Sequence, residues 1–324
     1  NVYNKSDDQT LKANQTWEAT DTGLYLTCTN PVDNWTTWYY TITYPTVTWV
    51  NTKTYRIRSK AVDLAANEES GTVERTFVID TSSPTSVIVA PPANNSIGNK
   101  GLVTISGTTS DDSAEVRTRT KYILSGTTYW WTGSAWDSTQ SDEASVVWRI
   151  QTSLTGSAPM VFRYESNFTW VTGRVYYIRT RSRDNATNTQ EDDNTIKFTY
   201  DDTPPTSSIS PPPAEAARYN SIPTLSGYCS DSPAGVNKIE LVLTRLTVGT
   251  SYWTGTIPEW DTPVSTLTAT LSADNTYWYR AAPTFLTDRK YNLKIWGTDK
   301  ATPANSDDKV YFASITFILD NQGP

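Results

Sequence analysis

The sequence predicts an all-β protein built from two-sheet sandwiches in tandem. Three observations carry this prediction: a residue pattern that recurs along the chain, short runs in which apolar and polar side chains alternate, and a composition that suits strands. The chain has 324 residues, with 13 Trp and 19 Tyr but one Met and no His. β-Branched and aromatic side chains fit a pleated surface, whereas helices favour Ala, Leu, Glu, Lys and Met. A chain of this length has room for two or three domains, each with its own core.

The recurring pattern has a period of about 120 residues, which makes it the first feature to interpret. Three segments end in Phe-x-x-Asp, at Phe77–Asp80, Phe198–Asp201 and Phe317–Asp320. Upstream of each ending, a run with alternating side chains begins at a Tyr and closes at an Asp: Tyr55–Asp63, Tyr176–Asp184 and Tyr291–Asp299. Another aromatic residue precedes each Tyr by six positions: Trp49, Trp170 and Phe285. Alternation of this kind predicts a strand with one buried face.

A polar turn is expected after each of these strands. The pattern Asp-x-Ala-x-Asn occurs at Asp63–Asn67 and Asp184–Asn188, and the third copy places Asn305 two positions later than expected after Asp299 and Ala301. Asp and Asn bond to their own backbone and tolerate left-handed conformations, so the triplet predicts a hairpin turn.

Proline-containing segments separate the copies. Asp80–Ser86 and Asp202–Ser207 contain prolines that stop a strand and keep the chain extended. The predicted domains are therefore residues 1–80, 81–202 and 203–324. Aligning Trp17 with Trp136 places residue 1 inside what should be a third strand, so repeat 1 is expected to lack its first strands. Upstream chain or another subunit would complete it, because an open sheet edge recruits a strand.

The repeats resemble a known family. Ile105–Asp111 reads Ile-Ser-Gly-Thr-Thr-Ser-Asp, Tyr252–Gly255 reads Tyr-Trp-Thr-Gly, and an Asp-x-Ala-x-Asn turn precedes a closing Phe-x-x-Asp. These motifs are similar to the bacterial Ig-like tandem repeats of large extracellular adhesins and surface proteins, and the resemblance covers essentially the whole chain. It implies an Ig-like sandwich in an extracellular or cell-surface setting. The family's usual Asp-x-Ala-Gly-Asn turn lacks its Gly here.

Charge and cysteine content exclude several classes of partner. The net charge of −7 and the pI near 4.8 argue against nucleic acid and anionic lipid. No apolar run is long enough for membrane insertion. Cys28 and Cys229 form neither a disulfide framework nor a metal-ligand cluster. They are either small, partly buried side chains or candidates for an intermolecular disulfide.

We expect no enzyme and no catalytic residue. Without His the chain lacks the commonest general base, and its paired carboxylates fall in predicted turns. We also expect no cofactor, except that calcium takes six to eight oxygens and turns supply them. The calcium candidates are Asp111, Asp112, Asp201, Asp202 and Asp231. The alternative is that these acids only form turns.

Two further sets of residues are candidates for glycan chemistry. The hairpin aromatics Trp130, Trp131 and Trp253 either contact glycans or pack across strands as part of the scaffold, and their recurrence favours packing. Candidate glycosylation sites carry the Asn-x-Ser/Thr signal, which a chain rich in Ser, Thr and Asn also produces by chance. They are Asn4, Asn14, Asn34, Asn94, Asn167 and Asn185.

These observations predict a non-enzymatic structural or adhesive segment of an extracellular fibre, stalk or cell-surface filament. Its partners would be neighbouring copies or further repeats of the same polymer, and cell-surface glycans. The alternative is a carbohydrate-binding β-sandwich array of a secreted or surface protein. Fold alone cannot separate the two functions, but the exposure of the hairpin Trp side chains can.

Overall fold

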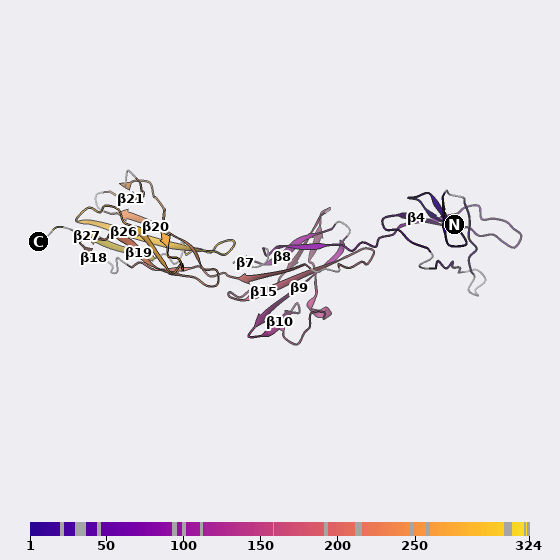
Figure 1. Cartoon of the computed structure of the whole chain (residues 1–324), viewed down its shortest axis with the longest axis horizontal. Coiled ribbons are helices and arrows are strands. Elements are labelled where there is room, and N and C mark those ends of the chain that lie inside the picture. The colour runs from indigo at the N-terminus through magenta and orange to yellow at the C-terminus, as the bar shows by residue number, and fades with distance from the viewer. Residues whose placement is uncertain are drawn as a thin grey trace. The chain divides into compact units, whose positions relative to one another are not determined.

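The computed structural model describes all residues except 20–22, 30–36, 44–46, 93–95, 99–101, 111–112, 158, 191–193, 211–215, 247–248, 257–259, 308–312, 321 and 323–324. Strands make up almost all of the regular structure, joined by one short 3-10 helix at Ser145–Val147 in the described part (Figure 1). None of the helical structure described is long and apolar enough to cross a membrane. By its contacts the chain forms two compact units: residues 1–84 with 183–189, and residues 85–182 with 190–324.

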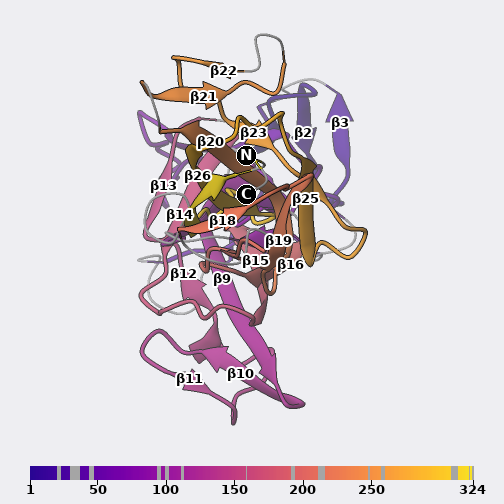
Figure 2. The ribbon, with the colours of Figure 1, turned by 90° about the vertical axis from the view of Figure 1, so that its left-hand side faces the viewer.

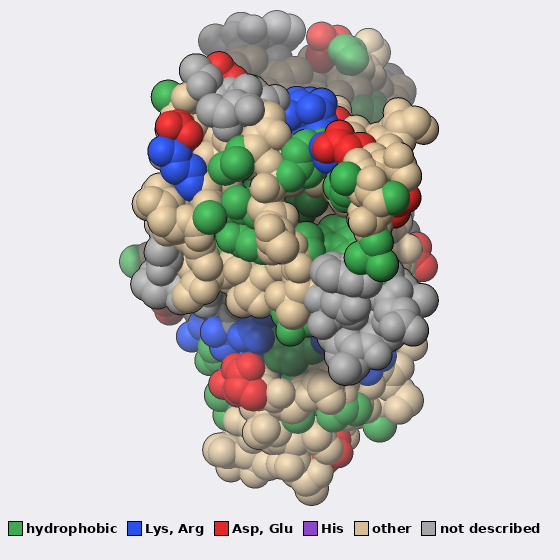
Figure 3. Space-filling view, turned by 90° about the vertical axis from the view of Figure 1, so that its right-hand side faces the viewer, with side chains coloured by type: hydrophobic (Ala, Val, Ile, Leu, Met, Phe, Trp, Pro, Cys, Tyr) green, Lys and Arg blue, Asp and Glu red, His purple; other side chains and the backbone are tan. Residues whose placement is uncertain are grey.

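The first unit contains one antiparallel sheet in the order β3-β2-β1-β4-β5. Its strands are β1 (Val2–Asn4), β2 (Gln9–Leu11), β3 (Trp17–Ala19), β4 (Thr54–Ser59) and β5 (Val73–Val78). Val2, Leu11 and Val47 form a buried apolar cluster in this unit. Within the described part of this unit no second sheet faces the first. Hydrophobic side chains are grouped around a hollow in the face shown in Figure 3.

The second unit contains two sandwiches with the same strand order. In the first, the larger sheet runs β11-β10-β9-β15-β16-β7 with β12 beside β9, and the smaller sheet runs β13-β14-β8-β6. The strands are β6 (Ser86–Ala90), β7 (Ser96–Gly98), β8 (Thr104–Thr109), β9 (Ser113–Leu124), β10 (Thr127–Trp131), β11 (Trp136–Asp137), β12 (Arg149–Ile150), β13 (Ser153–Thr155), β14 (Met160–Glu165), β15 (Val175–Asp184) and β16 (Asn194–Tyr200).

The second sandwich repeats this arrangement element by element. Its larger sheet runs β22-β21-β20-β26-β27-β18 with β23 beside β20, and its smaller sheet runs β17-β19-β25-β24 (Figure 2). The strands are β17 (Thr206–Ser207), β18 (Ala217–Tyr219), β19 (Thr224–Ser230), β20 (Val236–Arg245), β21 (Ser251–Trp253), β22 (Trp260–Asp261), β23 (Leu267–Thr268), β24 (Thr270–Leu271), β25 (Tyr277–Ala281), β26 (Arg289–Asp299) and β27 (Ala313–Leu319). Tyr176 on β15 and Tyr291 on β26 occupy equivalent strands, which confirms the predicted tandem Ig-like sandwiches.

A buried tyrosine lies at the centre of every copy. Tyr55, Tyr176 and Tyr291 are each 0% exposed. Their hydroxyl oxygens accept the backbone N–H of Val50 at 3.0 Å, of Val171 at 3.0 Å and of Leu286 at 2.9 Å, respectively. The donor in each case follows the aromatic residue that the sequence pattern places six positions before the Tyr. The hydroxyl therefore ties that loop to the middle of the central strand, as a tyrosine corner does in Ig-like domains.

Two aromatic rings at equivalent positions pack against the ring of each central tyrosine. Tyr176 packs against Trp170 at 4.7 Å and Phe198 at 5.8 Å between ring centroids. The corresponding distances are 4.7 and 5.8 Å in the first copy and 4.8 and 5.7 Å in the third. The recurring element of the repeat is thus an aromatic triad whose Tyr hydroxyl accepts one backbone N–H from the adjoining loop.

The predicted hairpin turns form through the Asp side chain. Oδ1 of Asp63 accepts the N–H of Asn67 at 2.8 Å, while Oδ2 accepts its side-chain amide at 2.8 Å. Asp184 bonds to Asn188 in the same way. In the third copy Asp299 makes both bonds to Asn305 despite the two extra residues.

The glycine of the Ser-Gly motif is required by a close approach between strands. A Cβ on Gly107 would collide with the carbonyl oxygen of Val87, and one on Gly227 would collide with that of Ser208. Both positions therefore need a residue without a side chain.

Replacing Trp170 with Ala should lower the free energy of unfolding by about 3–5 kcal/mol, as for other large buried aromatics. The side chain of Trp170 is 6% exposed and contacts the central tyrosine. Its counterpart Phe285 is only partly buried, so Phe285→Ala should cost less. Urea denaturation followed by Trp fluorescence and circular dichroism measures both.

Leu124→Ala is the matched control, because Leu124 is 47% exposed at a hairpin tip and should change stability by no more than about 0.5 kcal/mol. A loss for Trp170→Ala no greater than that of the control would contradict a core position for Trp170.

Candidate metal centre

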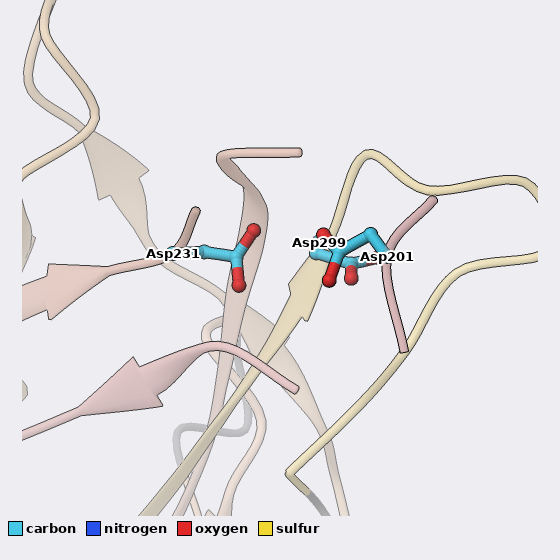
Figure 4. Close-up of side chains that lie close together, drawn as sticks. All are labelled: Asp201, Asp231 and Asp299. Atoms are coloured by element: carbon cyan, nitrogen blue, oxygen red, sulfur yellow. The ribbon is translucent and has the colours of Figure 1, made fainter. Parts of the chain in front are cut away.

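Three carboxylates from distant parts of the second unit converge near the end of the first sandwich. They belong to Asp201, which follows β16, to Asp231, which follows β19, and to Asp299, the last residue of β26 (Figure 4). One oxygen from each lies within 4.8 Å of the others. Asp201 and Asp299 are each 0% exposed, and Asp231 is partly exposed.

Backbone N–H groups fix the position of each carboxylate. Asp201 accepts from Thr203 at 3.1 Å and, through its other oxygen, from Ala234 at 3.1 Å. Asp231 accepts from Gly235 at 2.8 Å. Asp299 is held by the turn bonds to Asn305 described above. Each acid thus shapes a turn, as the simpler of the two sequence interpretations predicts.

The three carboxylates are not paired with a Lys or Arg side chain among the described residues. None of the ion pairs formed by the described residues includes Asp201, Asp231 or Asp299. Burial, and then the charges of Asp201 and Asp299, raise the pKa of Asp231 from 3.8 to about 6. Three carboxylates held this close repel one another, and a cation between them would relieve the repulsion.

The donor set fits a hard divalent cation such as calcium, which prefers carboxylate and carbonyl oxygens. The three side chains offer up to six oxygens, of which several also accept backbone bonds. Asp201, Asp231 and Asp299 are therefore the described residues able to hold a metal ion in this chain.

The sequence anticipated two of these three residues. The sequence predicts Asp201 and Asp231 as calcium candidates and Asp299 only as a turn residue. The candidate Asp202 lies outside the cluster and accepts a hydrogen bond from Thr172. Asp111 and Asp112 fall outside the described residues. The signal that could have identified Asp299 is its position at the end of a strand whose neighbour, β20, begins just after Asp231.

The hairpin tryptophans do not form an exposed platform. Trp130, Trp131 and Trp253 are 5%, 4% and 5% exposed. Trp131 donates its indole N–H to the hydroxyl of Tyr164 at 3.1 Å, and the guanidinium of Arg280 covers the Trp253 ring. Their interpretation as glycan contacts is therefore wrong, because the rings are already packed against protein groups.

Accessibility also separates the modification candidates. Cys229 is 4% exposed and its thiol faces the carbonyl oxygen of Asn275, so an intermolecular disulfide at Cys229 is incompatible with this fold. Burial raises its pKa to about 11. Cys28 is partly exposed and stays a candidate. Asn4 is 2% exposed and bonded to Asp7, which excludes it as a glycan acceptor.

The other candidate glycosylation sites divide into two groups. The side chains of Asn14, Asn167 and Asn185 are exposed and remain predictions. Asn34 and Asn94 lie outside the described residues.

Comparison with known proteins finds similarity to solved structures only. No protein-family model matches the sequence, and no curated protein matches it. Among solved structures it is similar to the three N-terminal domains of the highly immunogenic outer capsid protein of bacteriophage RB49, with 11% identity and a TM-score of 0.37 over 84% of this chain and 80% of that one.

Two further solved structures are similar to this chain at low sequence identity. The I67–I69 fragment of the titin I-band shows 9% identity and a TM-score of 0.33, covering 74% of this chain and 66% of that one. A calcium-stabilised ice-binding adhesin of an Antarctic bacterium shows 15% identity and a TM-score of 0.24, covering 84% and 58%. The similar structures are Ig-like and cadherin-type sandwiches.

In metal-free buffer, stability should fall as the pH rises from about 4 to about 6. The folded state keeps a proton on Asp231 up to its raised pKa of about 6, whereas the unfolded chain releases it near 3.8. Stability falls wherever the folded state binds more protons. The variant Asp231→Asn should lose this dependence and melt at a higher temperature than the parent at pH 7, as measured by calorimetry in EDTA.

Asp274→Asn is the control, because it should change the stability at neutral pH in the opposite direction. Hydrogen bonds from Ser272 and Thr276 lower the pKa of Asp274, so its removal should destabilise the protein at neutral pH. If Asp231→Asn showed the parent's pH profile, the proposed repulsion within the cluster would be wrong.

Proposed function

We propose that this chain is a structural and adhesive segment of an extracellular fibre, stalk or cell-surface filament, without catalytic activity. The observation that supports the proposal is a junction built from residues that recur in the repeats. The Asp that closes one copy is hydrogen-bonded to the Asn of the turn in the following copy.

The same bond occurs twice. The side-chain amide of Asn188 donates to the backbone carbonyl of Asp80 at 3.1 Å. The side-chain amide of Asn305 donates to the carbonyl of Asp201 at 3.3 Å. In both cases the Asn also closes its own turn. A single side chain thus completes the turn and anchors the preceding linker.

Further contacts fix the linker that follows Asp201. Its carboxylate accepts the N–H of Ala234, and Pro205 is buried against Gly297. Two of the linker's residues are prolines, which keep it extended. Such a connection suits a polymer of serial domains, in which each domain touches mainly its neighbours. Neighbouring copies or further repeats of the same polymer are then the principal partners.

A calcium ion at Asp201, Asp231 and Asp299 is the second part of the proposal. The three residues come from the end of one copy and from the strands of the next. A cation there would bind the folded junction only, and would therefore stabilise it by mass action. The donor set and the raised pKa of Asp231 support this role.

Stretching the chain between its ends should unfold the two complete sandwiches in separate steps. Each step should release about 40 nm, since about 120 residues extend by at most 3.3–3.6 Å each.

The variant Asn305→Ala should increase the rate of backbone amide hydrogen exchange in residues 201–206, because the backbone carbonyl of Asp201 in the linker loses its hydrogen-bond donor.

Asn67→Ala is the matched control. Asn67 makes the same turn bonds to Asp63, but its substitution should leave exchange in residues 201–206 unchanged. An unaltered exchange rate in Asn305→Ala would show that this side chain does not hold the linker.

Calcium should raise the melting temperature of the parent chain. A ligand present at 100 times its dissociation constant stabilises the folded state by about 2.7 kcal/mol. Asp231→Asn should abolish most of the shift, whereas the exposed acid Asp261 can be replaced by Asn without effect on it. Calorimetry in EDTA and in millimolar calcium measures the difference, and a parent chain indifferent to calcium would exclude this site.

A further inference from the structure

Three tyrosines form a continuous row on the outer face of the smaller sheet of the second sandwich. Tyr228 on β19 is 64% exposed, Tyr279 on β25 is 43% exposed, and Tyr277 is partly exposed. Tyr228 and Tyr277 are direct cross-strand partners with ring centroids 5.5 Å apart. Tyr277 and Tyr279 lie on the same face with centroids 6.4 Å apart. We call this row the tyrosine platform; its strands lie side by side in Figure 2.

The fold does not require aromatic residues at these positions. The first sandwich has the same sheet, in which β8 and β14 correspond to β19 and β25. Aligning Gly107 with Gly227 places Thr108 at the position of Tyr228. Val161 and Arg163 then correspond to Tyr277 and Tyr279. A purely structural role would predict similar residues in both copies, so the platform is a property of the second sandwich alone.

The chemistry of the platform is amphipathic and neutral. None of the hydrogen bonds among the described residues uses a hydroxyl of these three tyrosines. The neighbouring outward residues carry hydroxyl groups: Thr270 is exposed opposite Tyr279, and Thr206 and Ser230 are bonded to each other at 2.8 Å.

Two charged side chains close to the platform in sequence are engaged elsewhere. Arg280 directly follows Tyr279 on β25 and points to the other face of the sheet. There its guanidinium covers the ring of Trp253 and donates to the backbone carbonyl of Thr268. Asp274, in the turn before β25, accepts hydrogen bonds from Ser272 and Thr276. The platform therefore offers ring faces and hydroxyls without a net charge to a ligand.

We infer that the tyrosine platform binds a neutral glycan. A pyranose ring has a flat C–H face that packs on an aromatic ring and equatorial hydroxyls that bond to phenol, Ser and Thr. Tyr provides both kinds of contact from one rigid side chain, at a low cost in conformational entropy. An anionic glycan would need cationic side chains, which this face lacks in its described residues.

The size of the platform favours a glycan over a protein partner. A tyrosine offers about 150–250 Å², so three rings that are about half exposed present about 300 Å². Each partner of a stable protein interface buries about 800 Å². A short stretch of sugar chain fits the smaller area. The inference rests on the adhesive role proposed above, because it specifies the ligand to which an adhesive segment would attach.

The test is titration calorimetry of the full chain with neutral hexasaccharides. The probes are cellohexaose, chitohexaose, xylohexaose, maltohexaose and mannohexaose, with heparin fragments as the anionic comparison. We expect at least one neutral probe to bind and heparin not to bind. The double variant Tyr228→Thr/Tyr277→Val should bind the same probe at least tenfold more weakly. It should fold, because it carries the residues that the first sandwich has at these positions.

Tyr252→Thr is the control, since Tyr252 is a partly exposed tyrosine on the other sheet of the same sandwich and should retain binding. Failure of every neutral probe, binding of heparin alone, or full affinity in the double variant would each overturn the inference. Sedimentation equilibrium covers the remaining case, because self-association that the double variant abolishes would make the platform a protein interface instead. The linker measurements on Asn305→Ala do not involve the platform, so the two proposals can fail separately.

Discussion

One buried hydroxyl organises each copy of the repeat. The phenol of Tyr55, Tyr176 or Tyr291 accepts the N–H of the residue that follows the neighbouring aromatic. Two further aromatic rings pack against the tyrosine ring beside the central strand. An N–H group buried without an acceptor costs about 1–3 kcal/mol, so the loop can approach the core only if the hydroxyl is present. The loop, the central strand and the closing Phe strand depend on the same residue.

Local patterns determine how much of the fold the sequence predicts. The aromatic spacing, the alternating runs and the Asp-Asn turns are short-range features, and they are sufficient to predict that β15 and β26 are equivalent strands. The two extra residues in the third turn did not obscure it, because Asp299 still reaches Asn305. The structure of residues 1–84 was harder to anticipate, because β1 pairs with β4, a segment far from it in the sequence.

The residues of the two proposed sites were harder to predict because they meet only in three dimensions. Asp201, Asp231 and Asp299 are far apart in sequence, and Asp299 looks like an ordinary turn residue until β26 is placed beside β20. The prediction of glycan contacts at Trp130, Trp131 and Trp253 was wrong because an aromatic hairpin has the same sequence pattern whether its rings face solvent or pack against the protein. Tyr228, Tyr277 and Tyr279 carry no motif, and only the comparison with Thr108, Val161 and Arg163 distinguishes them.

The junction between copies has a consequence for how such a chain can evolve. The carbonyl of the closing Asp and the amide of the turn Asn are supplied by every copy, and the turn tolerates a change of length without losing either bond. Duplication or deletion of a whole copy would therefore leave each remaining neighbour with the same bonding partners. Recombination between copies could change the length of the chain in whole-domain increments without a new interface having to arise.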